Sequence, residues 1–235
     1  DLSRDLLGLP SISHAQPLIG LDVVAGGGAG IHSDEDALQG ENFVPGNTYV
    51  TAADLHSVDV KHGGKYVVAR RQAGVDGSTR IQQAANLAAR NGQRLLAFYG
   101  IDDRGGHLPF QTADGDYQPA PGQARTAEVY SAADIHENPT LAEMTTAALT
   151  VLQTKPNGFW LLIEAGDVDW ANHDNNLDNS IGAVNSGDKA FQVITRWVEE
   201  HSNWKETLVI LTADHGHYMV LDRPHDLVRP QQTSH

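Results

Sequence analysis

Residues 160–173 read WLLIEAGDVDWANH, an apolar run that changes abruptly into carboxylates and an imidazole. An unbroken apolar run followed by a glycine turn is typical of a strand buried on both faces of a parallel sheet. Ligands of such sheets bind beyond the carboxyl ends of the strands, so Glu164 is predicted to line a binding crevice. Asp169 and His173 follow four residues apart. On a helix they would share one face and could bind one cation together.

A second stretch repeats this design. Residues 207–217 read TLVILTADHGH, which predicts another buried strand followed by Asp214, His215 and His217. Apolar residues at helical spacing between the two stretches predict a crossover helix over residues 180–201. Taken singly, each histidine is more simply explained as an exposed or hydrogen-bonded residue. Their clustering with acids after both strands indicates a metal site instead, because unpaired buried charge is costly.

The remainder of the chain carries weaker patterns of the same kind. A strand, a helix and a strand in close succession predict a parallel unit. The sequence therefore predicts an α/β fold, a three-layer α/β/α sandwich with a mostly parallel central sheet, in one domain over residues 1–235. The expected strands are residues 18–25, 65–70 and 94–99, and the further expected helices are residues 52–57, 78–90 and 140–152.

Composition limits the classes of partner and ligand. The chain has 235 residues, of which 40% are hydrophobic, enough for one domain with a full core. Its formal net charge is -14 without any block of Lys or Arg, which disfavours nucleic acid and anionic membranes as partners. No apolar stretch approaches the length of a membrane span. Cysteine is absent, so a transition metal would have to be bound by His, Asp and Glu.

Two other ligand-binding interpretations are weaker. The glycines at 26–28 follow a predicted strand, but they lack the spacing of a phosphate-binding loop and favour a simple backbone turn. Residues 174–185 are rich in Asp and Asn, as a calcium loop would be. However, they lack its glycine at the sixth position and its glutamate at the twelfth, where Asn185 stands.

At these motifs the sequence resembles the alkaline phosphatases. The resemblance rests on the pattern E-x-G-x-x-D-x-x-x-H at residues 164–173, followed by TADHGH at residues 212–217. The Asp-His-Gly element also occurs in related sulfatases, phosphodiesterases and phosphomutases, whereas the first pattern is typical of alkaline phosphatases themselves. Further similar stretches are residues 21–28, 106–110 and 138–145, so that the resemblance covers most of the chain.

The resemblance implies a phosphomonoester hydrolase with two zinc ions and one magnesium ion. It assigns Asp169 and His173 to one zinc, together with a third histidine for which His235 is the candidate. It assigns Asp214 and His215 to the second zinc, and Glu164 to magnesium. His217 would orient a ligating carboxylate such as Asp169. The family also implies small phosphate monoesters as substrates, a periplasmic or extracellular location, and a homodimer.

One element of the resembled family is missing from the matched region. The family's serine nucleophile, an early aspartate and a phosphate-binding arginine all precede that region, so the resemblance implies a nucleophile upstream of Asp1. No serine of this chain stands in the family's Asp-Ser-Ala setting, and Arg4 is too isolated to be that arginine. We therefore expect residues 1–235 to lack the N-terminal nucleophile segment and the C-terminal end of the domain, and to have no turnover alone. A zinc-binding module without catalysis, and a phosphodiesterase or sulfatase of the same superfamily, are the alternatives.

Overall fold

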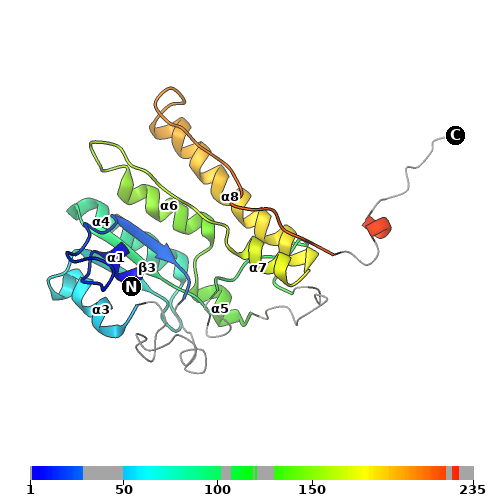
Figure 1. Cartoon of the computed structure of the whole chain (residues 1–235), viewed down its shortest axis with the longest axis horizontal. Helices are drawn as coiled ribbons and strands as arrows, with labels where there is room; N and C mark the ends of the chain where they lie inside the picture. Colours follow the sequence, from blue (N-terminus) through cyan, green and yellow to red (C-terminus); the bar gives the residue numbers. More distant parts are fainter. Residues whose placement is uncertain are drawn as a thin grey trace.

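A small parallel sheet lies among helices at the left of the view in Figure 1. The computed structural model describes residues 2–28, 50–101, 107–118, 120, 130–220 and 224–227. The sheet has the strand order β1-β3-β2, and both strand pairs are parallel. These strands are β1 (Val23–Gly26), β2 (Tyr66–Arg70) and β3 (Arg94–Phe98).

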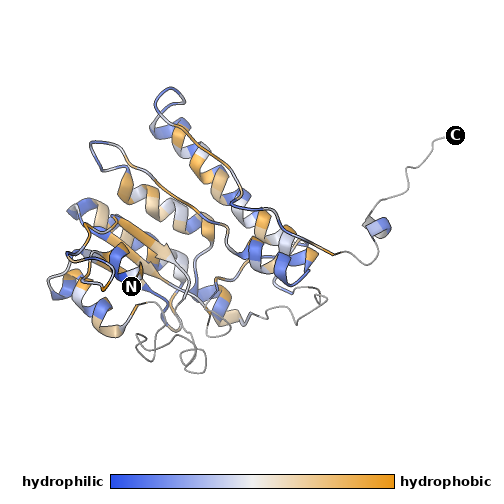
Figure 2. Ribbon diagram, in the orientation of Figure 1, coloured by the Kyte–Doolittle hydropathy of each residue, from blue (hydrophilic) through white to orange (hydrophobic). Residues whose placement is uncertain are grey.

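Helices cover both faces of this sheet, as the three-layer prediction requires. Because side chains alternate along a strand, Leu95 and Ala97 of β3 face one way while Leu96 and Phe98 face the other. The first pair packs in a core with α4 (Gly77–Asn91) and α6 (Leu141–Leu152). The second pair packs with α1 (Leu2–Leu7) and α3 (Ala52–Val58). Figure 2 shows the apolar strands between these helices. The predicted α/β class is confirmed.

The β2-α4-β3 unit forms where the sequence predicts it. At the start of α4, a side-chain oxygen of Asp76 accepts a hydrogen bond from the backbone N–H of Thr79. At its end Gly92 adopts φ 62°, a left-handed conformation that glycine takes at little cost. The buried face of the helix follows the spacing i, i+3, i+4 and i+7 through Ile81, Ala84, Ala85 and Ala88.

Helix α6 begins at a capping box, just after Thr140. The backbone N–H of Glu143 donates to the Thr140 hydroxyl, and a carboxylate oxygen of Glu143 accepts from the backbone N–H of Thr140. This reciprocal pair satisfies two backbone donors that the first turn of a helix leaves free.

Replacing Thr140 by alanine should therefore lower the free energy of unfolding by about 1 kcal/mol. Urea unfolding followed by circular dichroism would measure the change. The matched control is Thr146→Ala, an exposed threonine of the same helix whose hydroxyl donates only to the carbonyl of Ala142. Equal losses of stability in the two variants would contradict the capping role.

The two strands predicted at residues 160–163 and 207–211 do not form, and this part of the prediction is wrong. In Figure 1 both segments run back from the far ends of α6 and α8 (Leu177–His201) toward α7 (Asp167–His173). The backbone of these segments pairs with no strand within the described ranges. Trp160 and Leu208 are 80% and 82% exposed. An apolar run becomes a strand only when a neighbour pairs with its backbone.

The first of these segments packs on a helix instead. The rings of Phe159 and Trp197 lie 5.3 Å apart, and Ala165 faces Gly187. The segment therefore runs along α8 in the direction opposite to that of the helix. Helix α8 in turn packs on α6 and α7. The remaining elements are α5 (Ala132–Glu137) and the short 3-10 helices η1 (Val60–His62) and η2 (Pro224–Leu227). Within the described ranges, no helix combines the length and the apolar character that crossing a bilayer requires.

Candidate metal centre

Helix α7 presents Asp169 and His173 on one face, as their spacing predicts. Nε2 of His173 lies 3.4 Å from Oδ2 of Asp169. Neighbouring elements hold the helix in place. Ala171 is buried, the hydroxyl of Ser180 on α8 donates to Oδ1 of Asn172, and the ring of His107 lies 5.1 Å from that of Trp170. His107 follows β3 in the chain, so it links α7 to the sheet.

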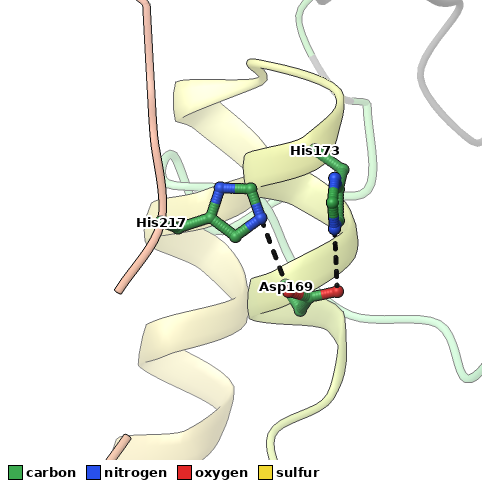
Figure 3. Close-up of side chains that lie close together, drawn as sticks. All are labelled: Asp169, His173 and His217. Atoms are coloured by element: carbon green, nitrogen blue, oxygen red, sulfur yellow. Dashed lines mark ion pairs between the residues drawn. The ribbon is translucent and has the colours of Figure 1, made fainter. Parts of the chain in front are cut away.

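His217 reaches this pair from a distant part of the chain (Figure 3). Its Nε2 lies 3.4 Å from Oδ1 of Asp169, and its ring packs edge-on against that of His173 at 4.4 Å between centroids. The His217 side chain is only 19% exposed. The candidate ligand atoms of Asp169, His173 and His217 all lie within 4.8 Å of one another. We call these three residues the Asp169 cluster.

The electrostatics of this cluster suit a cation. Oδ1 of Asp169 is shielded from solvent and accepts no hydrogen bond from any residue that the structure describes. A shielded acceptor that accepts no hydrogen bond costs about 1–3 kcal/mol, and a bound cation would remove that cost. Two imidazole nitrogens and one carboxylate oxygen form a donor set that zinc prefers. The residues present therefore fit a zinc ion.

The residues assigned to a second zinc lie at the edge of this cluster. Nε2 of His215 is 3.6 Å from Oδ1 of Asp169 and 3.6 Å from Oδ2 of Asp214. The carbonyl of Gly216, at 3.0 Å from Nδ1, and the charge of Asp214 raise the pKa of His215 above its usual value. The Asp214 side chain is 88% exposed.

Of the other two predicted ligands, only Glu164 is among the described residues. Glu164 is exposed and is not a member of the Asp169 cluster. His235 lies outside the described residues. The assignments of Glu164 to magnesium and of His235 to zinc thus remain predictions.

No serine of residues 1–235 stands in the Asp-Ser-Ala setting expected of the nucleophile. Its expected place is upstream of Asp1, and Asp1 itself also lies outside the described residues, which begin at Leu2. The placement of the nucleophile before Asp1 therefore remains a prediction. The described part of the chain contributes candidate metal ligands to the site.

The resemblance gives His217 only an orienting role, whereas the structure places its ring nitrogen among the candidate ligand atoms. A signal for this was present in the sequence. Residues 215–217 read His-Gly-His, and side chains two apart in an extended segment point to the same side. Both imidazoles accordingly face Asp169, at 3.6 Å and 3.4 Å.

The fold and the site define a three-layer α/β protein with a candidate metal-binding group of His and Asp side chains. Comparison with known proteins makes the assignment specific, since the family model described as alkaline phosphatase matches residues 21–228. The chain belongs to the alkaline phosphatase family.

Individual relatives match a shorter part of the chain. The membrane-bound alkaline phosphatase of Bombyx mori is 40% identical over 86 residues, which are 37% of this chain and 15% of that protein. Alkaline phosphatase H of Pseudomonas aeruginosa is 40% identical over 79 residues, 34% of this chain and 16% of that protein. The alkaline phosphatase of Escherichia coli K12 is 38% identical over 79 residues, with the same two shares. The chain thus covers about a sixth of the length of the curated relatives that it matches.

Proposed function

We propose that this chain forms the metal-binding part of a phosphomonoester hydrolase, an alkaline phosphatase that releases inorganic phosphate. The observation that carries the proposal is the convergence of Asp169, His173 and His217 from two stretches of chain. Membership of the alkaline phosphatase family supports the phosphate ester as the substrate class.

We assign the residues to two zinc ions and one magnesium ion. Asp169 and His173 would hold the first zinc, and the geometry favours His217 as a further ligand beside or in place of His235. Asp214 and His215 would hold the second zinc, and Glu164 would contribute to magnesium binding. When bound, such ions polarise phosphoryl oxygens and stabilise the attacking and leaving oxygens of an in-line displacement.

The protein side chains have their own tasks in this proposal. The carboxylate of Asp169 lies between the imidazoles of His173, His215 and His217, and its negative charge orients their ring nitrogens. The mutual contact of the His173 and His217 rings restricts both rotamers. A site whose ligands are held in this way loses less entropy when a metal binds.

We further propose that the nucleophile comes from a segment upstream of Asp1, because no serine of residues 1–235 has the setting expected of it. On this proposal residues 1–235 bind metal but have no turnover alone. The proposal also places the protein in the periplasm or outside the cell, with small phosphate monoesters as substrates and a homodimer as its assembly. The net charge of -14 argues against nucleic acid and anionic membrane surfaces as partners.

The test measures how fast the full natural protein that contains this chain hydrolyses three esters. We expect p-nitrophenyl phosphate to be hydrolysed faster than bis(p-nitrophenyl) phosphate and p-nitrophenyl sulfate. Removal of metal with EDTA should abolish the activity, and Zn²⁺ with Mg²⁺ should restore it. Faster hydrolysis of the diester or the sulfate would favour the alternative enzymes of the superfamily. Tight zinc binding without hydrolysis of any ester would favour the non-catalytic module.

A further inference from the structure

His217 belongs to a part of the chain that burial alone does not hold in place. We call residues 214–220 the return segment, because they bring the chain back to α7. His217 stands 44 positions after His173 in the sequence. The segment contains no helix or strand, and Tyr218, next to His217, is 91% exposed. Another interaction must therefore fix its position against α7.

The structure shows a hydrogen bond that can do this. The backbone N–H of Val220 donates to Oδ1 of Asn175 at 2.8 Å. Asn175 stands two residues after His173, and Val220 stands three residues after His217. Three residues of extended chain span about 10 Å at most, so this bond limits how far His217 can move from His173.

The backbone of Asn175 has a special conformation as well. Its φ is 51°, and within the described ranges it is the one non-glycine residue with a positive φ. Asparagine tolerates this left-handed conformation better than most residues do. The turn ends α7: the N–H of Asn175 donates to the carbonyl of Asn172, and that of Asn176 to the carbonyl of Ala171. One residue thus ends the helix that carries Asp169 and His173, and binds the segment that carries His217.

We propose that Asn175 is a positioning residue of the metal centre, which brings the return segment into register with α7 so that His217 can join Asp169 and His173. This inference rests on the proposed metal centre. It does not depend on ester hydrolysis, because its test measures Zn²⁺ binding and the local structure.

Three substitutions separate the side chain from the backbone. Asn175→Gly keeps the left-handed backbone accessible and removes the acceptor, whereas Asn175→Asp keeps an acceptor oxygen at the same place. Asn175→Ala removes the acceptor and disfavours the backbone conformation. We expect Asn175→Gly and Asn175→Ala to bind Zn²⁺ about tenfold more weakly than the wild type, as is usual when a residue that orients a ligand is lost. Asn175→Asp should bind at least as tightly as the wild type.

Coupling to His217 distinguishes positioning from a general loss of structure. In a His217→Ala background, Asn175→Gly should cause no further loss of Zn²⁺ affinity, because the ligand that it positions is gone. A further loss of about tenfold in that background would overturn the inference. Full Zn²⁺ affinity of Asn175→Gly would overturn it as well.

Two measurements without metal keep the inference testable if Zn²⁺ does not bind. In the wild type and in Asn175→Asp, the Val220 amide should exchange slowly, and a nuclear Overhauser effect should connect the rings of His173 and His217. Both signals should be lost in Asn175→Gly. Equal Zn²⁺ binding by the wild type and by His217→Ala would contradict the assignment of His217 to the metal. Retention of both signals in Asn175→Gly would contradict the role of Asn175.

Discussion

Replacing Asp169 by alanine is expected to lower the affinity of the chain for Zn²⁺ by at least about 100-fold, the upper end of the loss seen when a ligand's supporting partner is removed. Asp169 is the common partner of His173, His215 and His217, at distances of 3.4 to 3.6 Å. Without its carboxylate, the Asp169 cluster would lose its one oxygen ligand and the negative charge that attracts the cation, and only imidazoles would remain in it. Competition with a chromophoric chelator would give the affinity, and mass spectrometry of the purified protein would give its zinc content.

The matched control is Asp188→Ala. Asp188 is an exposed carboxylate on α8 that accepts a hydrogen bond from Gln192 and is not part of the Asp169 cluster. Its loss should leave zinc binding unchanged, because an exposed charge outside the first coordination sphere is screened by solvent. Unchanged zinc content in Asp169→Ala would show that the site has been assigned to the wrong residues.

Replacing Ile81 by alanine should lower the free energy of unfolding by about 2–5 kcal/mol, the range for removing a large aliphatic side chain from a core. Ile81 has no exposed surface and lies on α4 in the core between this helix, β3 and α6. The loss combines the lower burial of apolar surface with the cavity that the neighbouring side chains cannot fill. Urea unfolding should be measured with EDTA present, so that bound metal does not contribute to stability.

Leu87→Ala provides the comparison within the same helix. Leu87 is 41% exposed, and alanine has the highest intrinsic preference for helix, so the change should be about 0.5 kcal/mol or less. A similar loss in both variants would mean that α4 does not pack on the sheet as described. A smaller loss in Ile81→Val, about 0.5–1.5 kcal/mol, would support the cavity explanation.

Local patterns were sufficient to predict much of the fold. The caps at Asp76 and Thr140 and the turn at Gly92 act within four residues of chain, and the elements that they delimit form as predicted. The short helix α5 was missed, although Ser131 and Asp134 form a capping box that the sequence already contains. Its length of six residues gives too little apolar periodicity to be recognised.

The predictions failed where structure depends on distant neighbours. Residues 160–163 and 207–211 have the composition of buried strands, yet they remain extended with exposed apolar side chains. The composition of a segment indicates how well it suits a sheet. Whether another strand pairs with it depends on other parts of the chain. The residues that follow these segments, Asp169, His173 and His217, still come together. They do so because both segments run back toward α7 from the ends of two helices (Figure 1).

The sequence alone indicated which residue types could bind a metal and that Asp169 and His173 would share one face if their segment were helical, because a spacing of four is a property of the helix itself. It could not establish that His217 would complete the group with them, since 44 residues separate His217 from His173. That encounter depends on the packing of α8 against α7 and on the hydrogen bond from Val220 to Asn175. Contacts between distant residues follow from the path of the whole chain, and only the tertiary structure contains that path.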